Sequence, residues 1–277
     1  SGRAAELGVL YRKGEALESL SHVDTIVFDK TGTLTEGRPR LTDLQVTDGD
    51  RNEALRLAAA AETGSEHPLA QAIVAAARER QIDLPAVNAF QATPGFGVSA
   101  QVDGHQILIG NARHLAQENI DTDALAGTVD NYTADGKTPV FLAIDGVLRA
   151  VLAIADPLKP EAAAMVAELR NRGLKVIMIT GDSQKTAQAI ARQAGIDQIH
   201  AETLPDGKAT VVQDMQANGS KVAFVGDGIN DAPALAQAEV GIAVGTGTDI
   251  AIEAADVTLT RGDLSSVLTA LDVAKRT

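Results

Sequence analysis

Apolar and polar positions alternate with two different periods along the chain. From about residue 161 onward, helical patterns alternate with short apolar runs. This order is typical of a parallel sheet with helices on both faces. Pro160 and Gly173 bracket a predicted helix over 161–172, and the apolar run 174–179 predicts a buried strand after it. Further predicted elements are a helix ending near Gly195, a strand near Ile199, a helix over 208–217, and strands over 222–225, 240–244 and 257–259.

The region from about residue 40 to 155 predicts an antiparallel sheet with helices, inserted after the first strand of the parallel domain. Asp-Gly pairs at 103–104 and 145–146 stand at hairpin positions. We therefore expect a first domain over 1–38 and 156–277 and a second over 39–155. The predicted elements of the insert are helices over 52–62 and 67–80 and strands over 91–102, 106–109, 140–144 and 147–154.

Composition agrees with two globular domains and narrows the candidate functions. The chain has 277 residues, of which 45% are hydrophobic and 22% charged. Its formal net charge of −13 and the lack of a basic run make nucleic acid an unexpected partner. The absence of cysteine excludes disulfides and thiolate metal sites within the chain. Apolar runs such as 151–155 have the length of core strands, so we expect this piece to be soluble.

Asp29 is the candidate nucleophile. It follows the apolar run 26–28 and opens the loop Lys-Thr-Gly-Thr. An isolated Asp in this position is usually a turn or capping residue. Ligands of parallel sheets, however, bind beyond the carboxyl ends of the strands. The polar loops 29–32, 180–182 and 226–231 are expected to converge there.

Two of these loops carry a family resemblance. Residues 29–35 (Asp-Lys-Thr-Gly-Thr-Leu-Thr) resemble the phosphorylation signature of P-type ion-pumping ATPases, and residues 226–231 resemble the hinge-and-magnesium signature of the same family. The resemblance implies a haloacid-dehalogenase-like parallel α/β fold with ATP and Mg²⁺ as cofactors. It also implies transfer of the ATP γ-phosphoryl group to Asp29. The residues implied in this reaction are Lys30, Thr31, Thr180, Gly181, Lys208 and Asn230, and those implied around Mg²⁺ are Asp29, the Thr31 carbonyl, Asp227 and, supporting them, Asp231.

Thr31 bears on the choice between a pump and a phosphatase. Phosphatases of the superfamily place a second Asp two residues after the nucleophile, as the acid and base of hydrolysis. Here that position is Thr31. A long-lived aspartyl-phosphate is therefore expected, as a transporter requires.

The insert resembles the nucleotide-binding domain of heavy-metal-transporting P-type ATPases. In that family the equivalents of Glu62 and His67 contact adenine. The equivalents of Gly95 and Gly97 let the backbone approach the nucleotide, and the Gly110-Asn111 pair lies against the ribose and phosphates. Each of these signals is weak alone, and their order and spacing carry the resemblance.

The segment 204–208 (Leu-Pro-Asp-Gly-Lys) is most like that of bacterial copper(I) pumps. The leading hypothesis is therefore the autophosphorylating part of a copper(I)-exporting ATPase on the cytoplasmic side of the membrane. Its membrane helices, actuator domain and copper(I) site would lie outside this chain, so this piece alone would not transport. A zinc or cadmium pump, a free-standing phosphatase and a nucleotide-sensing module without turnover stay open as alternatives.

Overall fold

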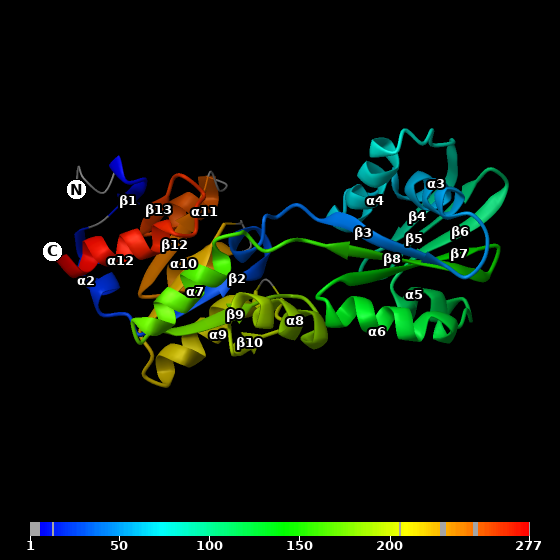
Figure 1. The fold of residues 1–277 in the computed structure, drawn as a ribbon. Helices are drawn as coiled ribbons and strands as arrows, with labels where there is room; N and C mark the ends of the chain where they lie inside the picture. Colours follow the sequence, from blue (N-terminus) through cyan, green and yellow to red (C-terminus); the bar gives the residue numbers. More distant parts are fainter. Residues whose placement is uncertain (1–5, 13, 205, 228–230, 246–248, 277) are drawn as a thin grey trace. The chain divides into compact units, whose positions relative to one another are not determined.

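The computed structural model describes residues 6–12, 14–204, 206–227, 231–245 and 249–276. The chain divides into two compact units, one made of Ser1–Gly37 with Pro157–Thr277 and the other of Arg38–Asp156. The insert expected over 39–155 lies inside the second unit. Figure 1 shows the elements of each unit.

A seven-stranded sheet forms the centre of the described first unit, in the order β1-β13-β12-β11-β2-β9-β10. Every neighbouring pair is parallel except β1 and β13, which are antiparallel. The predicted parallel sheet is thus confirmed, with β1 added as an edge strand that the sequence pattern did not predict. The strands are β1 Val9–Tyr11, β2 Thr25–Asp29, β9 Lys175–Ile179, β10 Gln198–His200, β11 Val222–Gly226, β12 Val240–Val244 and β13 Val257–Leu259.

Alternation along each strand sends side chains into two cores. In β2, Ile26 and Phe28 pack in one cluster and Val27 in the other. Full burial of Phe28 stabilises the fold by about 1.5–3 kcal/mol. The helices on the first side are α2 Gly14–Ser21, α7 Ala162–Asn171, α8 Gln184–Ala194 and α12 Ser266–Arg276, those on the second are α9 Gly207–Ala217 and α10 Ala232–Gln237, and α11 Asp249–Ala254 precedes β13.

The second unit holds a six-stranded antiparallel sheet in the order β3-β8-β7-β6-β5-β4. Helices α3 and α4 pack on one face and α5 and α6 on the other (Figure 1). The elements are β3 Arg40–Val46, α3 Arg51–Glu62, α4 Pro68–Glu79, β4 Val87–Thr93, β5 Gly97–Val102, β6 His105–Gly110, α5 Ala112–Gln117, a 3₁₀ turn Asp123–Leu125, α6 Ala126–Ala134, β7 Thr138–Ile144 and β8 Val147–Ala155.

The predicted hairpins form, but the predicted strand over 91–102 is wrong. Both Asp-Gly pairs have positive φ at each residue, as the tight two-residue turns of hairpins require. The stretch 91–102 is instead a hairpin of β4 and β5, with a turn in which the Phe96 amide donates to the Thr93 carbonyl at 3.0 Å. Pro94 has no N–H for a ladder, and Gly95 turns the chain at φ +79°.

No helix among the described residues is both long and apolar enough to cross a membrane.

Candidate functional site

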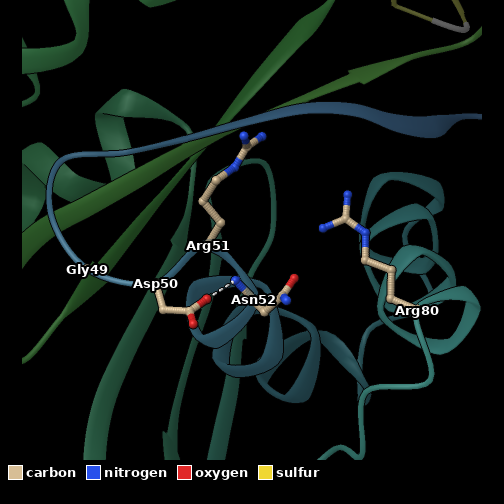
Figure 2. Close-up of a pocket in the computed structure, with 5 residues that line it drawn as sticks. All are labelled: Gly49, Asp50, Arg51, Asn52 and Arg80. Atoms are coloured by element: carbon tan, nitrogen blue, oxygen red, sulfur yellow. Dashed lines mark hydrogen bonds between the residues drawn. The ribbon is translucent and has the colours of Figure 1, made fainter.

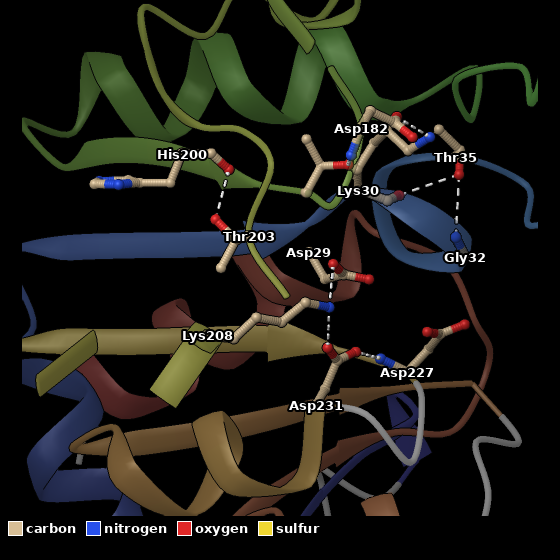
Figure 3. A network of polar contacts seen from close by, with 11 residues as sticks. Asp29, Lys30, Gly32, Thr35, Asp182, His200, Thr203, Lys208, Asp227 and Asp231 are labelled. Atoms are coloured by element: carbon tan, nitrogen blue, oxygen red, sulfur yellow. Dashed lines mark hydrogen bonds and ion pairs between the residues drawn. The ribbon is translucent and has the colours of Figure 1, made fainter. Parts of the chain in front are cut away.

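Asp29, Lys208 and Asp231 form a buried ion-pair cluster at the carboxyl ends of β2 and β11. The Lys208 Nζ lies 2.7 Å from Asp29 Oδ1 and 2.7 Å from Asp231 Oδ1 (Figure 3). Asp29 is 6% exposed, Lys208 8% and Asp231 1%. Three segments that are distant in sequence therefore bring one ammonium between two carboxylates, as predicted for Asp29 and Lys208.

Burial and the neighbouring charges shift the pKa values of Asp29 and Lys208. The pKa of Asp29 is raised, mainly by burial and next by the negative charge of Asp231. The positive charge of Lys208 lowers this pKa but does not cancel the shift. Burial would lower the pKa of Lys208, but the two carboxylates outweigh it and the net shift is upward. Lys208 is accordingly a permanent counter-charge in this site.

Asp227 joins the cluster from the loop after β11. Its backbone amide donates to Asp231 Oδ2 at 3.2 Å. Burial, with Asp231 second, raises the pKa of Asp227 to about 6. At Gly32, which has a φ of +75°, any Cβ would lie 2.1 Å from Asp227 Oδ2. The absence of a side chain at Gly32 is thus what lets the first loop meet this carboxylate.

The carboxylates of Asp29, Asp227 and Asp231 suit a hard divalent cation such as Mg²⁺. Their ligand atoms lie within 4.8 Å of one another. Asp231 already uses Oδ1 for Lys208 and Oδ2 for the Asp227 amide. The donor set thus fits Mg²⁺ best with Asp29 and Asp227 as ligands and Asp231 as their support.

Lys30 does not pair with Asp29, whose carboxylate pairs with Lys208. The Lys30 Nζ pairs instead with Asp182 Oδ2 at 2.6 Å, which ties the first loop to the loop after β9 (Figure 3). The convergence of these two loops was predicted, but Asp182 was not among the predicted site residues, because its ion pair with Lys30 leaves no local signal in the sequence. Thr35 was also missed: it is fully buried, accepts from the Gly32 amide at 3.0 Å and donates to the Lys30 carbonyl at 3.1 Å.

The remaining predicted reaction residues are placed as follows. Thr31 is exposed in the irregular helical turn Lys30–Leu34. Thr180 is buried and its hydroxyl accepts from the Asp182 amide at 3.1 Å, while Gly181 is exposed. Asn230 lies outside the described residues.

A pocket of about 360 Å³ in the second unit gathers all six predicted nucleotide residues. Apolar and small side chains make up most of the rest of its lining. The predicted residues are Glu62, His67, Gly95, Gly97, Gly110 and Asn111.

Glycine is required at two positions of this pocket. A Cβ on Gly97 would lie 2.1 Å from the Ile109 carbonyl oxygen, and one on Gly110 would lie 2.2 Å from the Phe96 carbonyl oxygen. The ring of His114 packs behind both glycines. The two strands therefore approach closely enough to leave an open backbone surface in the pocket.

His67 and Asn111 each begin a helix as well as lining the pocket. His67 Nδ1 accepts from the Leu69 amide at 3.2 Å at the start of α4. Asn111 Oδ1 accepts from the His114 amide at 3.0 Å, and its Nδ2 donates to the Gly95 carbonyl at 2.8 Å. These bonds fix both side chains at the pocket wall.

Glu62 stands at the end of α3 with 6% of its surface exposed. Its Oε2 is enclosed and has no hydrogen-bond partner among the described residues. Burial raises the pKa of Glu62 to about 7. An acid in this position is partly protonated near neutral pH.

A larger, more open hollow of about 720 Å³ lies at the start of α3 (Figure 2). Arg51 and Arg80 extend at its sides. The Asp50 carboxylate already accepts from the Asn52 amide at 2.6 Å, so the helix start is capped by a negative group. This charge opposes an anion, and we assign no function to the hollow.

Known proteins with similar sequences are hydrolases and metal-transporting ATPases. The haloacid dehalogenase-like hydrolase family matches residues 23–239. The chain is 54% identical to "Copper-transporting ATPase 2" of Rhizobium meliloti and 47% identical to "Copper-exporting P-type ATPase" of Bacillus subtilis, in each case over 100% of this chain. It spans only 34% and 35% of the lengths of these two relatives.

Among the solved structures that resemble this chain, two that each cover 99% of it are ATPases. One is a zinc-transporting PIB-type ATPase in the E2.Pi state, with 39% identity, a TM-score of 0.82 and 45% of that chain covered. The other is the catalytic domain of the CPx-ATPase CopB-B, with 30% identity, a TM-score of 0.78 and 98% of that chain covered.

Proposed function

The chain belongs to the haloacid dehalogenase-like hydrolase family and, within it, to the catalytic domains of P-type ATPases, and on this premise we propose that Asp29 accepts the γ-phosphoryl group of ATP. The observation that carries the proposal is the ammonium of Lys208 held 2.7 Å from both Asp29 and Asp231. A nucleophilic carboxylate that approaches a phosphate needs such a counter-charge.

The transfer exchanges one bond for another. An oxygen of the Asp29 carboxylate forms a bond to the γ-phosphorus while the bond from that phosphorus to the β,γ-bridging oxygen breaks, and ADP leaves. Lys208 offsets the charge that the carboxylate and the phosphoryl oxygens share. Mg²⁺, held by Asp29 and Asp227, would supply further charge neutralisation. Lys30 positions the loops through Asp182.

Thr31 favours this reaction over a phosphatase. An exposed threonine stands at the position where superfamily phosphatases place their second Asp, and it cannot act as a general base at neutral pH. Hydrolysis of the aspartyl-phosphate would then depend on a group outside this chain.

The pocket of the second unit is the proposed ATP site. Its enclosed apolar wall suits a purine, and the open backbone at Gly97 and Gly110 suits close approach of the nucleotide. The pocket and Asp29 belong to different units. Transfer therefore requires a conformation that delivers the γ-phosphate to Asp29.

We further propose copper(I) as the cargo of the whole pump, since the curated relatives named above at 47–54% identity are named as copper transporters. The membrane helices and the actuator domain would be partners of this portion, which would lie on the cytoplasmic side. In the full-length pump, copper(I) should stimulate ATP hydrolysis. Stimulation by Zn²⁺ without stimulation by copper(I) would favour the zinc alternative.

Labelling with ATP that carries radioactive γ-phosphate tests the catalytic proposal. The wild type with Mg²⁺ should become labelled, and hydroxylamine, which cleaves acyl-phosphates, should release the label. Asp29→Asn should stay unlabelled while still binding ATP. Rapid multiple turnover of para-nitrophenyl phosphate would instead favour a phosphatase, and ATP binding with no label or beryllofluoride adduct at Asp29 would favour a sensing module.

A further inference from the structure

Phe90 is a large apolar side chain at the edge of the second unit's sheet. It stands on β4, the last strand in the order of that sheet, and 38% of its surface is exposed. It belongs to neither of the two hydrophobic clusters that the described residues of this unit form. Its ring therefore packs against something other than the core of the unit.

The ring of Phe90 packs on Gly64, in the loop between α3 and α4. A Cβ built on Gly64 would lie 3.3 Å from each of three ring atoms, Cδ2, Cε1 and Cε2. Because Cδ2 and Cε1 are opposite corners of the ring, equal distances to both place the face of the ring over Gly64. Gly64 has no left-handed φ, so glycine fits this position because of the ring and not because of its backbone conformation.

A strained bulge in β4 directs Phe90 toward this loop. The register between β4 and β5 shifts between Asn88 and Gln91, so that Ala89 and Phe90 together face one residue of β5. Ala89 has a φ of +49°, a conformation that is costly for a residue with a Cβ. Bulges of this kind change the direction of a side chain. The side chain that directly follows the strained residue is Phe90, whose ring reaches the loop.

The loop under the ring connects residues of the pocket wall. Glu62 ends α3 and His67 caps the start of α4, with Gly64 between them. The Ser65 amide donates to the Glu62 carbonyl at 3.0 Å, and the His67 amide donates to Ser65 Oγ at 3.3 Å. All three of these neighbours of Gly64 line the pocket. A shift of Gly64 would therefore move a continuous piece of the wall.

The strand that carries Phe90 supplies another piece of the same wall. Ala92 and Thr93 of β4 line the pocket, and Pro94 follows them in the lining. Phe90 itself is absent from the lining. Its ring thus joins the α3–α4 loop to β4 beside the pocket, without facing the space that a ligand would fill.

We propose that Phe90 is a positioning residue of the nucleotide pocket: its ring holds the loop between α3 and α4 against β4 and thereby sets the positions of Glu62 and His67. The proposal rests on the proposed function of the pocket as the ATP site. It adds a residue outside the lining that acts on nucleotide affinity through the loop.

Calorimetric titration with the β,γ-methylene analogue of ATP measures the effect of the ring. Phe90→Ala should lower affinity by roughly tenfold, within the range over which neighbouring residues couple. Val147→Ala is the matched control, because it removes an apolar side chain that is 51% exposed, in the same unit but outside the pocket lining, and it should leave affinity unchanged.

Two outcomes separate this proposal from the function on which it rests. Wild-type affinity in Phe90→Ala would overturn the positioning role while leaving the pocket as the ATP site. Failure of the wild type to bind the analogue would instead overturn the assignment of the pocket, and the positioning role with it.

A double-mutant cycle tests the contact between the ring and the loop. Gly64→Ala adds a Cβ 3.3 Å from the ring, which is closer than ordinary carbon–carbon contact, so the ring or the loop must shift. This substitution should lower affinity at least about threefold more in the wild type than in Phe90→Ala, where the ring is gone. An equal effect of Gly64→Ala in the two backgrounds would contradict the proposal.

Hydrogen exchange of the nucleotide-free protein gives a readout independent of affinity. In Phe90→Ala, amides of residues 63–69 should lose protection while those of β7 and β8 keep it. Unchanged protection of 63–69 would contradict a hold of the ring on the loop. Equal loss in β7 and β8 would show that the ring supports the whole unit, and this too would overturn the positioning role.

Discussion

Replacement of Lys208 by methionine tests the account of the buried cluster through stability alone. The substitution removes one ammonium that makes two ion pairs at 2.7 Å, and it leaves Asp29, Asp227 and Asp231 within 4.8 Å of one another. Loss of one partner of a buried ion pair costs about 3–5 kcal/mol. Because Lys208 serves two buried carboxylates, we expect a loss of free energy of unfolding toward the upper end of that range.

Hydrogen exchange read by mass spectrometry separates the effect by unit. Amides of β2 and β11 report on the unit that holds Lys208, and amides of β7 and β8 report on the other. At about 1.4 kcal/mol per tenfold, Lys208→Met should reduce protection of β2 and β11 by on the order of 1,000-fold. Protection of β7 and β8 should stay unchanged.

The control is Lys221→Met, which removes a lysine with an exposed side chain from the same unit and should leave protection of β2 and β11 nearly intact. In Lys208→Met, added Mg²⁺ should restore part of the protection, because a cation would again offset the carboxylates. Equal protection in Lys208→Met and the wild type would refute the reasoning, since the ammonium would then not be the counter-charge of this site.

Three further predictions concern the pocket. Gly97→Ala puts a Cβ 2.1 Å from the Ile109 carbonyl oxygen at a backbone φ of +153°, so ATP affinity measured by calorimetry should fall by at least about tenfold. The control is Gly127→Ala in α6, where a Cβ would have nothing within 4 Å. His67→Gln should weaken ATP binding while α4 stays folded, and an unchanged affinity would contradict a role of His67 at adenine. The pKa of Glu62 rises from 4.5 to about 7 on folding, so its contribution to the free energy of unfolding is complete below pH 4.5 and is lost as pH rises through 7, at a cost of about 3 kcal/mol. Chemical unfolding of the second unit should show this pH dependence in the wild type. The same pH dependence in Glu62→Gln would contradict the assignment to Glu62.

Much of the fold was predictable because the two sheets differ in the pattern of apolar runs, helical segments and turn residues along the sequence. The alternation of helices and apolar runs after residue 161 predicted the parallel sheet, and the two Asp-Gly pairs predicted hairpins. The edge strand β1 gave no such signal, because it has only three residues and depends on β13 for its pairing. The hairpin of β4 and β5 was predicted as one strand, although Pro94 and Gly95 stand at the turn that divides it.

The candidate site was predictable where residues lie on continuous motifs. Asp29 ends β2 and Asp227 directly follows β11, and Lys208 was predicted from the motif of its segment. The convergence of the loops that hold Lys30 and Asp182 was predicted, but the ion pair between the two side chains was not, because it depends on which strands of the sheet are neighbours. The burial of Glu62 at the end of α3 likewise has no signature in the sequence around it, because it depends on tertiary packing.

Chemical mapping of the phosphorylated residue tests the central claim most directly. Reduction of an aspartyl-phosphate by borohydride converts that aspartate to homoserine, which mass spectrometry can locate. After incubation with ATP and Mg²⁺, the account predicts homoserine at position 29 in the wild type. Homoserine at another aspartate, or none in a protein that has bound ATP and Mg²⁺, would contradict it.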